Sequence, residues 1–204
     1  MNYWVLGCGT LVSASESHPE SLPGGLWAVA SGLRDLDHTF RWMNSARPAS
    51  AWSFRLPECS QAEAITCLRG LRQEADWLAV HARFDWASLI GANAVVEGWR
   101  GLRRRQLPEN LRLPCLRSTH ELRECVQAAA DGCLGTIFGP IWDTPSKHGL
   151  LTPRGLEQLA EACALGGKVI AIGAVDTPER VEQCLRAGAH AIAVLRSTND
   201  HGLM

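Results

Sequence analysis

Short apolar runs alternate with segments of helical periodicity along most of this chain. The runs are rich in Val, Ile, Leu, Ala and Trp, and apolar residues fill consecutive rather than alternate positions. This pattern is typical of strands that are buried on both faces of a sheet. We predict eight such strands, at 26–30, 51–55, 77–81, 94–97, 113–117, 134–138, 168–172 and 191–195.

The segments between these strands carry signals for helix starts and ends. Ser60 and Glu63 form a capping box, and Pro178 occupies the first turn of a later helix. Ser118 or Thr119 is predicted to cap a helix that starts at the next residues. We predict helices at 36–44, 60–71, 85–90, 120–130, 152–164 and 177–187, with a surface helix or loop at 100–109.

Alternating strands and helices predict parallel strands, because each crossover is long enough to return the chain to the same edge. For 204 residues, the closed (β/α)₈ TIM barrel fits this alternation better than an open sheet. Nine residues follow Leu195, so the final helix is expected to be missing or very short. We expect residues 26–204 to form the barrel domain, and residues 1–25 to form an N-terminal extension that packs on it where the eighth helix would lie.

Composition narrows the class of protein. Hydrophobic residues make up 46% and charged residues 20% of the chain, which is globular, and a net charge of −1 predicts no nucleic-acid partner. No apolar run approaches the ~20 residues of a membrane span, and no signal peptide is apparent. The eight cysteines are scattered without a C-x-x-C pair, which favours a cytoplasmic protein without a disulfide or metal framework.

Polar residues follow several predicted strands, where barrel folds place their chemistry. The loop after strand 134–138 holds Thr144, Ser146 and Lys147, which together suit a phosphate, although an ordinary solvated loop is the alternative. His120 is a candidate acid or base near neutral pH, or an inert residue at the start of a helix. The remaining phosphate or substrate candidates are Arg55, Ser118, Gly173, Ala174, Arg196 and Ser197. The acidic residues are dispersed, so no convincing metal site is predicted.

The chain resembles the thiamine phosphate synthase/TenI superfamily over roughly residues 26–200. The resemblance rests on Ser118-Thr119-His120, on Phe138 to Lys147, on Ala171 to Val175 with Pro178-Glu179, and on Ala187-Gly188-Ala189. It implies a (β/α)₈ fold, a pocket for a phosphorylated thiazole and a homodimer.

The resemblance is closer to the TenI branch. The synthase joins a pyrimidine pyrophosphate to a thiazole phosphate and holds magnesium with two aspartates, whose positions here are Ala82 and Gly101. TenI-type proteins isomerise a thiazole carboxylate phosphate without a metal, using the histidine that matches His120. They also have an aromatic-Arg pair, comparable to Trp99-Arg100.

The resemblance therefore implies a thiazole tautomerase that aromatises its substrate by proton transfer through His120, with no cofactor. One alternative is a thiamine phosphate synthase, which would need Mg²⁺. Another is a non-catalytic descendant that binds a phosphorylated ligand or a partner protein, a reading kept open by Ala174 in place of a second glycine.

Overall fold

The computed structural model describes residues 21–45, 49–55, 59–98, 100–144 and 149–197. The strands are β1 (Gly25–Ser31), β2 (Ala51–Arg55), β3 (Leu78–His81), β4 (Ala94–Glu97), β5 (Cys115–Thr119), β6 (Gly135–Phe138), β7 (Val169–Ile172) and β8 (Ala191–Ser197). The helices are α1 (Leu36–Ser45), α2 (Gln61–Glu74), α3 (Phe84–Ile90), α4 (Leu122–Ala130), α5 (Gly155–Ala164) and α6 (Pro178–Arg186).

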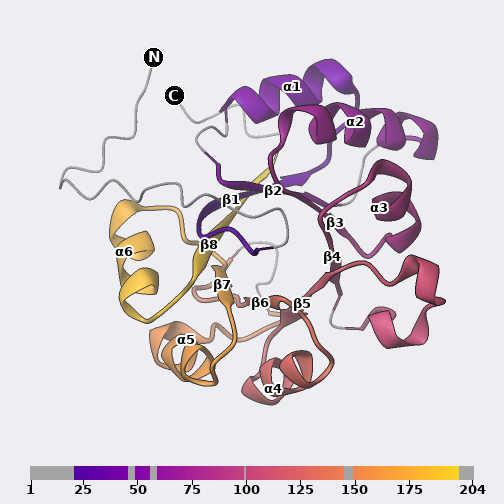
Figure 1. Cartoon of the computed structure of the whole chain (residues 1–204). Helices are drawn as coiled ribbons and strands as arrows, with labels where there is room; N and C mark the ends of the chain where they lie inside the picture. The colour runs from indigo at the N-terminus through magenta and orange to yellow at the C-terminus, as the bar shows by residue number, and fades with distance from the viewer. Residues whose placement is uncertain (1–20, 46–48, 56–58, 99, 145–148, 198–204) are drawn as a thin grey trace.

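The eight strands close into a parallel barrel, and the helices lie around its outside (Figure 1). Each strand pairs with the next in the sequence, and β8 closes the ring by pairing with β1. Trp27 of β1 illustrates the closure, since it lies beside Ala51 of β2 on one side and Ala193 of β8 on the other. The predicted (β/α)₈ fold is confirmed.

Strand alternation divides the side chains into an inner core and an outer layer. Trp27 and Val29 of β1 face the barrel interior, whereas Ala28 and Ala30 face the helices. Inside, the rings of Trp27 and Trp77 lie 4.7 Å apart and tilted by 54°, packed among small residues of the other strands. The barrel interior is therefore a packed core rather than a channel, and a site for chemistry is expected at the ends of the strands.

The residues just before β1 close the amino-terminal end of the barrel. Leu22 is buried within the inner core, and its carbonyl oxygen lies 3.0 Å from the His190 ring nitrogen Nε2. The indole N–H of Trp27 donates to the Pro23 carbonyl at 3.0 Å. Residues 1–20 and 198–204 lie outside the described part of the chain, so the packing of the extension and the missing final helix remain predictions.

The basic segment at 100–109, predicted as a surface helix or loop, is a loop without an α-helix. It contains two short 3₁₀ turns, Arg104–Gln106 and Glu109–Leu111. Leu107 separates them with an extended backbone (φ −94°, ψ 154°), as expected for a residue before proline. The backbone N–H of Arg104 donates to the buried carboxylate of Glu97 at 2.5 Å, which fixes the first turn against the barrel.

The prediction that Ser118 or Thr119 caps α4 is wrong. Both residues complete β5, where Ser118 pairs with Ile137 of β6, and the cap is Glu121. The carboxylate of Glu124 accepts the backbone N–H groups of His120 and Glu121, at 2.6 and 3.1 Å. Sheet pairing continues two residues further than the sequence indicated, and the helix starts correspondingly later.

Candidate active site

Strand alternation turns polar side chains of neighbouring strands toward the carboxyl mouth of the barrel. Every second residue of a strand faces the same side, and the preceding inward residues of these strands belong to the inner core. The polar residues that continue this inward face are Ser31 of β1, Ser53 and Arg55 of β2, His81 of β3 and Ser118 of β5. In the described part of the mouth, these side chains combine hydroxyl groups, the positive charge of Arg55 and an imidazole.

His81 is held as a neutral side chain within this group. Its Nε2 lies 2.5 Å from the Ser53 hydroxyl oxygen on the adjacent strand. Burial, and then the positive charge of Arg55, lower the pKa of His81 to about 3. A neutral imidazole at this position hydrogen-bonds without adding charge, so Arg55 supplies the fixed charge of the described group.

His120 lies between the carboxyl ends of β5 and β6. It is 8% exposed, and it precedes α4 instead of starting it as predicted. Its Nδ1 is within hydrogen-bond distance of the Gly139 carbonyl oxygen, which can only accept, so Nδ1 carries the proton. In the neutral ring the lone pair is then on Nε2, the nitrogen suited to accept a hydrogen bond or a proton.

Two predicted phosphate positions, Gly173 and Ala174, join the loops that follow β6 and β7. A side chain on Gly173 would meet Pro140 Cα at 2.6 Å, so these backbones touch. Ala174 adopts the left-handed conformation (φ 49°), which glycine favours, and its carbonyl accepts the Arg180 guanidinium at 2.8 Å. Loop packing therefore requires glycine at position 173, whatever else this residue contacts.

The other predicted positions are only partly described. Thr144 is half-buried in the segment after β6. The backbones of Arg196 and Ser197 complete β8 and pair with Ala30 and Ser31 of β1, but their side chains lie outside the described part. Ser146, Lys147 and Trp99 also lie outside the described residues, so their predicted roles stay predictions.

The ends of β3 and β4 do not fit a magnesium ion. Ala82 follows β3 in the left-handed conformation (φ 58°), and Gly101 follows β4. In the described residues around these two ends, the carboxylates are Asp85 and Glu97. Asp85 accepts both ends of the Arg83 fork at 2.9 and 2.6 Å, and Glu97 is enclosed on the outer face of the barrel. Neither offers the inward carboxylate oxygen that a hard cation requires.

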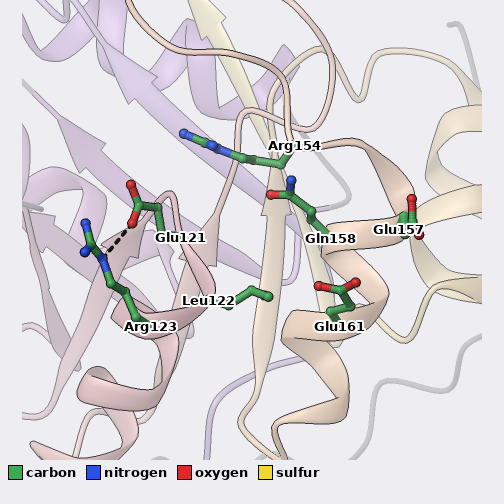
Figure 2. A pocket seen from close by; sticks show the side chains of 7 residues that line it. All are labelled: Glu121, Leu122, Arg123, Arg154, Glu157, Gln158 and Glu161. Carbon is green, nitrogen blue, oxygen red and sulfur yellow. Dashed lines mark ion pairs between the residues drawn. The ribbon is translucent and has the colours of Figure 1, made fainter.

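A hollow of about 650 Å³ lies outside the barrel, between the start of α4 and α5 (Figure 2). Its lining residues are Glu121, Leu122, Arg123, Arg154, Glu157, Gln158 and Glu161. Glu121 and Arg123 pair across 2.6 Å on its rim. None of the inward mouth residues lines it, so we place the candidate active site at the barrel mouth.

Comparison with known proteins gives the family. A family described as thiamine monophosphate synthase matches residues 55–198, which include Arg55, His81, Ser118 and His120. The thiamine-phosphate synthase of Anaeromyxobacter dehalogenans is 33% identical over 181 residues, covering 85% of this chain and 80% of that protein. The chain belongs to the thiamine monophosphate synthase family.

Two further thiamine-phosphate synthases match over shorter spans. The thiamine-phosphate synthase of Salinibacter ruber is 42% identical over 81 residues, 39% of this chain and 34% of that protein. The Mycobacterium tuberculosis synthase is 35% identical over 129 residues, which cover 58% of this chain and 55% of that protein.

A solved structure supports the fold. The thiamine phosphate pyrophosphorylase of Pyrococcus furiosus superposes with a TM-score of 0.68 at 21% identity, over 84% of this chain and 85% of that one.

These relatives overturn the expected branch. The resemblance implied a TenI-type thiazole tautomerase, yet the curated proteins at 33–42% identity are named thiamine-phosphate synthases. The tautomerase assignment is therefore wrong, and the synthase alternative is the better supported. The findings place the chain among enzymes of thiamine biosynthesis.

In the described residues no helix has the length and apolar character needed to cross a membrane.

Proposed function

We propose that the chain is a thiamine-phosphate synthase, which joins a pyrimidine pyrophosphate to a thiazole phosphate and releases pyrophosphate. The observation that carries this proposal is the 33% identity with a synthase of that name across 85% of the chain. The family match at 55–198 also spans the described mouth from Arg55 to His120.

The charge at the mouth suits two phosphorylated substrates. Arg55 carries a permanent positive charge and a planar fork of donors, which matches phosphate geometry. Ser118 adds a hydroxyl on β5. Because His81 stays neutral above its pKa of about 3, it offers hydrogen bonds but no positive charge to the substrate phosphates.

His120 is assigned a positioning role in this reaction. The coupling forms a carbon–nitrogen bond and breaks a carbon–oxygen bond, and no proton leaves carbon. A general base at carbon is therefore not needed, which removes the role that the tautomerase assignment gave to this residue. With Nδ1–H committed to the Gly139 carbonyl, Nε2 is the atom that orients a substrate group.

Positively charged side chains of the protein stabilise the departing pyrophosphate in this proposal. The described carboxylates near β3 and β4 do not form a magnesium site, so we assign no step to an ion held there. A guanidinium that is already in place when negative charge develops lowers the barrier without reorganisation. We therefore assign this stabilisation to Arg55.

The test is a coupling assay with purified full chain, the pyrimidine pyrophosphate and the thiazole phosphate, with and without added magnesium. Thiamine phosphate and pyrophosphate are expected in equal amounts. Arg55→Ala should lower kcat/KM by roughly 100-fold. Arg123→Ala is the matched control, because that arginine lies on the rim of the outer hollow and should leave the rate unchanged.

The negative outcome is also informative. Failure to form thiamine phosphate in either condition, together with tight binding of the thiazole phosphate in calorimetry, would contradict the synthase proposal. That combination would favour a ligand-binding descendant instead. Equal activity of Arg55→Ala and the unmodified chain would contradict the role given to Arg55 while leaving the synthase reaction in place.

A further inference from the structure

Two cysteines that are 18 positions apart in the sequence meet on the outer face of the barrel. The thiol of Cys115 donates to Cys133 Sγ at a sulfur–sulfur distance of 3.4 Å. Cys115 opens β5 at its amino end, and Cys133 lies in the turn between α4 and β6, adjacent elements in Figure 1. The pair is therefore at the opposite end of β5 from the candidate active site.

The local backbone brings the two sulfurs together. Cys115 precedes the inward Leu116, so its side chain faces outward toward α4. The N–H of Leu134 donates to the Cys115 carbonyl at 2.8 Å, which places Cys133 beside the start of β5. The N–H of Cys133 donates to Ala128 of α4 at 3.0 Å and holds the turn.

The two sulfurs differ in acidity. The hydrogen bond from Cys115, and then the charge of Arg117, lower the pKa of the Cys133 thiol, although burial opposes this. The same hydrogen bond and burial raise the pKa of Cys115, which stays a thiol. The carboxylates of Glu97 and Asp131 also face Cys133 and oppose its ionisation, so the balance depends on Cys115 and Arg117.

The Glu97 carboxylate, which lies near both cysteines, does not suit binding of a metal ion. Glu97 lies within 4.8 Å of both sulfurs, and the three residues have ligand types that suit a soft cation. Glu97 is committed elsewhere, however: Oε2 accepts Arg117 at 2.7 and 2.9 Å, and Oε1 accepts the Arg104 N–H. A cation would have to displace a guanidinium, so the chemistry of this cluster is that of a thiol pair.

Cys133 is reachable from the surface, whereas Cys115 is not. Cys133 is half-buried and lines a small hollow of about 50 Å³ between α4, α5 and β6. Cys115 is 1% exposed behind it. An accessible thiol of lowered pKa in front of a buried partner is the arrangement in which one cysteine attacks and the second resolves.

We propose that Cys115 and Cys133 form a reversible disulfide by exchange with a low-molecular-weight disulfide. The Cys133 thiolate attacks one sulfur of that disulfide, which breaks its S–S bond, releases one small thiolate and leaves a mixed disulfide. Cys115 then attacks Cys133 Sγ and expels the second small thiolate, which takes up the Cys115 proton. Both protein thiols are oxidised, and one small disulfide is reduced to two thiols.

The new bond would constrain the part of the chain that carries the candidate site. The loop closed by Cys115 and Cys133 contains Ser118, His120 and α4. The sulfurs need to approach from 3.4 Å to about 2.05 Å, a small local movement. Closing a loop of this length is expected to raise Tm by roughly 5–10 °C.

The test treats the native full chain with oxidised glutathione, blocks remaining thiols with N-ethylmaleimide and maps the peptides by mass spectrometry. The expected product is a Cys115–Cys133 link that dithiothreitol reverses and that raises Tm. Cys115→Ala should stop at a glutathione adduct on Cys133. Cys163→Ser is the matched control, because that cysteine is also half-buried but burial raises its pKa to about 11.

A rate measurement on the unmodified protein keeps the proposal testable if a variant fails to fold. Iodoacetamide should alkylate Cys133 at least about 10-fold faster than Cys163 at neutral pH. Equal alkylation rates for the two cysteines would overturn the proposal. So would a glutathione-treated chain that carries only mixed disulfides, or links between other cysteines, with Cys115 and Cys133 still reduced.

Discussion

His120 and Gly139 join the carboxyl ends of β5 and β6 through a hydrogen bond from the imidazole to the glycine carbonyl. Gly139 has no room for a side chain, because a Cβ atom there would lie 2.1 Å from the Ile172 carbonyl oxygen. The position of the accepting carbonyl is therefore fixed by contact with β7. The orientation of His120 depends on this three-strand contact as well as on its own rotamer.

His120→Ala is expected to lower kcat/KM for the coupling by about 10–100-fold, because Nε2 no longer orients the substrate. His120→Asn retains an N–H donor for the Gly139 carbonyl but lacks a nitrogen at the Nε2 position. If orientation is the role, the asparagine variant should keep the stability of the unmodified chain but share the kinetic loss. Urea unfolding and steady-state kinetics on both variants separate the two effects, and full activity of either would contradict the assignment.

Stability is expected to fall on acidification because of His81. Its pKa in the folded protein is about 3, against an ordinary value of 6.5, so the unfolded chain binds the extra proton between these pH values. The free energy of unfolding is then fully retained above about pH 6.5 and falls as pH decreases toward 3, by at most about 1.4 kcal/mol per pH unit.

His81→Asn tests this, since it removes the titration and keeps a polar side chain beside Ser53. The pH dependence of its urea midpoint between pH 4 and 6.5 should be flatter than that of the unmodified chain. An unchanged slope would mean that other groups cause the acid sensitivity.

The sequence predicted the strands well because both faces of each are buried, which leaves an apolar run such as 168–172. The sequence also identified His120 as a candidate site residue, because its position directly after a strand can be read from neighbouring residues. It missed the contact between Ser53 and His81, which are 28 positions apart, because that contact depends on the register of β2 against β3. At 100–109 the sequence left a helix or a loop open, and Pro108, which forces an extended Leu107, was the visible signal for the loop.

Ala174→Gly is expected to stabilise the protein by about 0.5–1 kcal/mol. Ala174 has a φ of 49°, where an L side chain clashes with its own backbone and glycine does not. The same reasoning applies to Ala82 at φ 58°. Ala128 in α4 provides a control, because glycine at a buried helical position should destabilise instead. Urea midpoints that move in the same direction at positions 174 and 128 would contradict this interpretation.

Arg117 connects two acidic residues across the outer face of the barrel, and its loss should be costly. It is 3% exposed, and it pairs with Glu97 at 2.7 Å and with Asp131 at 2.8 Å. Arg117→Met removes the nearer guanidinium of the buried Glu97 carboxylate and leaves the Arg103 guanidinium at 3.7 Å, which is expected to cost about 3 kcal/mol of unfolding free energy.

The double variant Arg117→Met/Glu97→Leu should recover much of that loss, because it removes the buried carboxylate together with its main partner. The two single variants and the double variant form a cycle that isolates the pair. Chemical denaturation of all four proteins measures it. Losses that simply add would show that the Arg117–Glu97 pair makes no specific contribution, and the stabilising effect of Arg117 would then come from Asp131 and from side-chain packing.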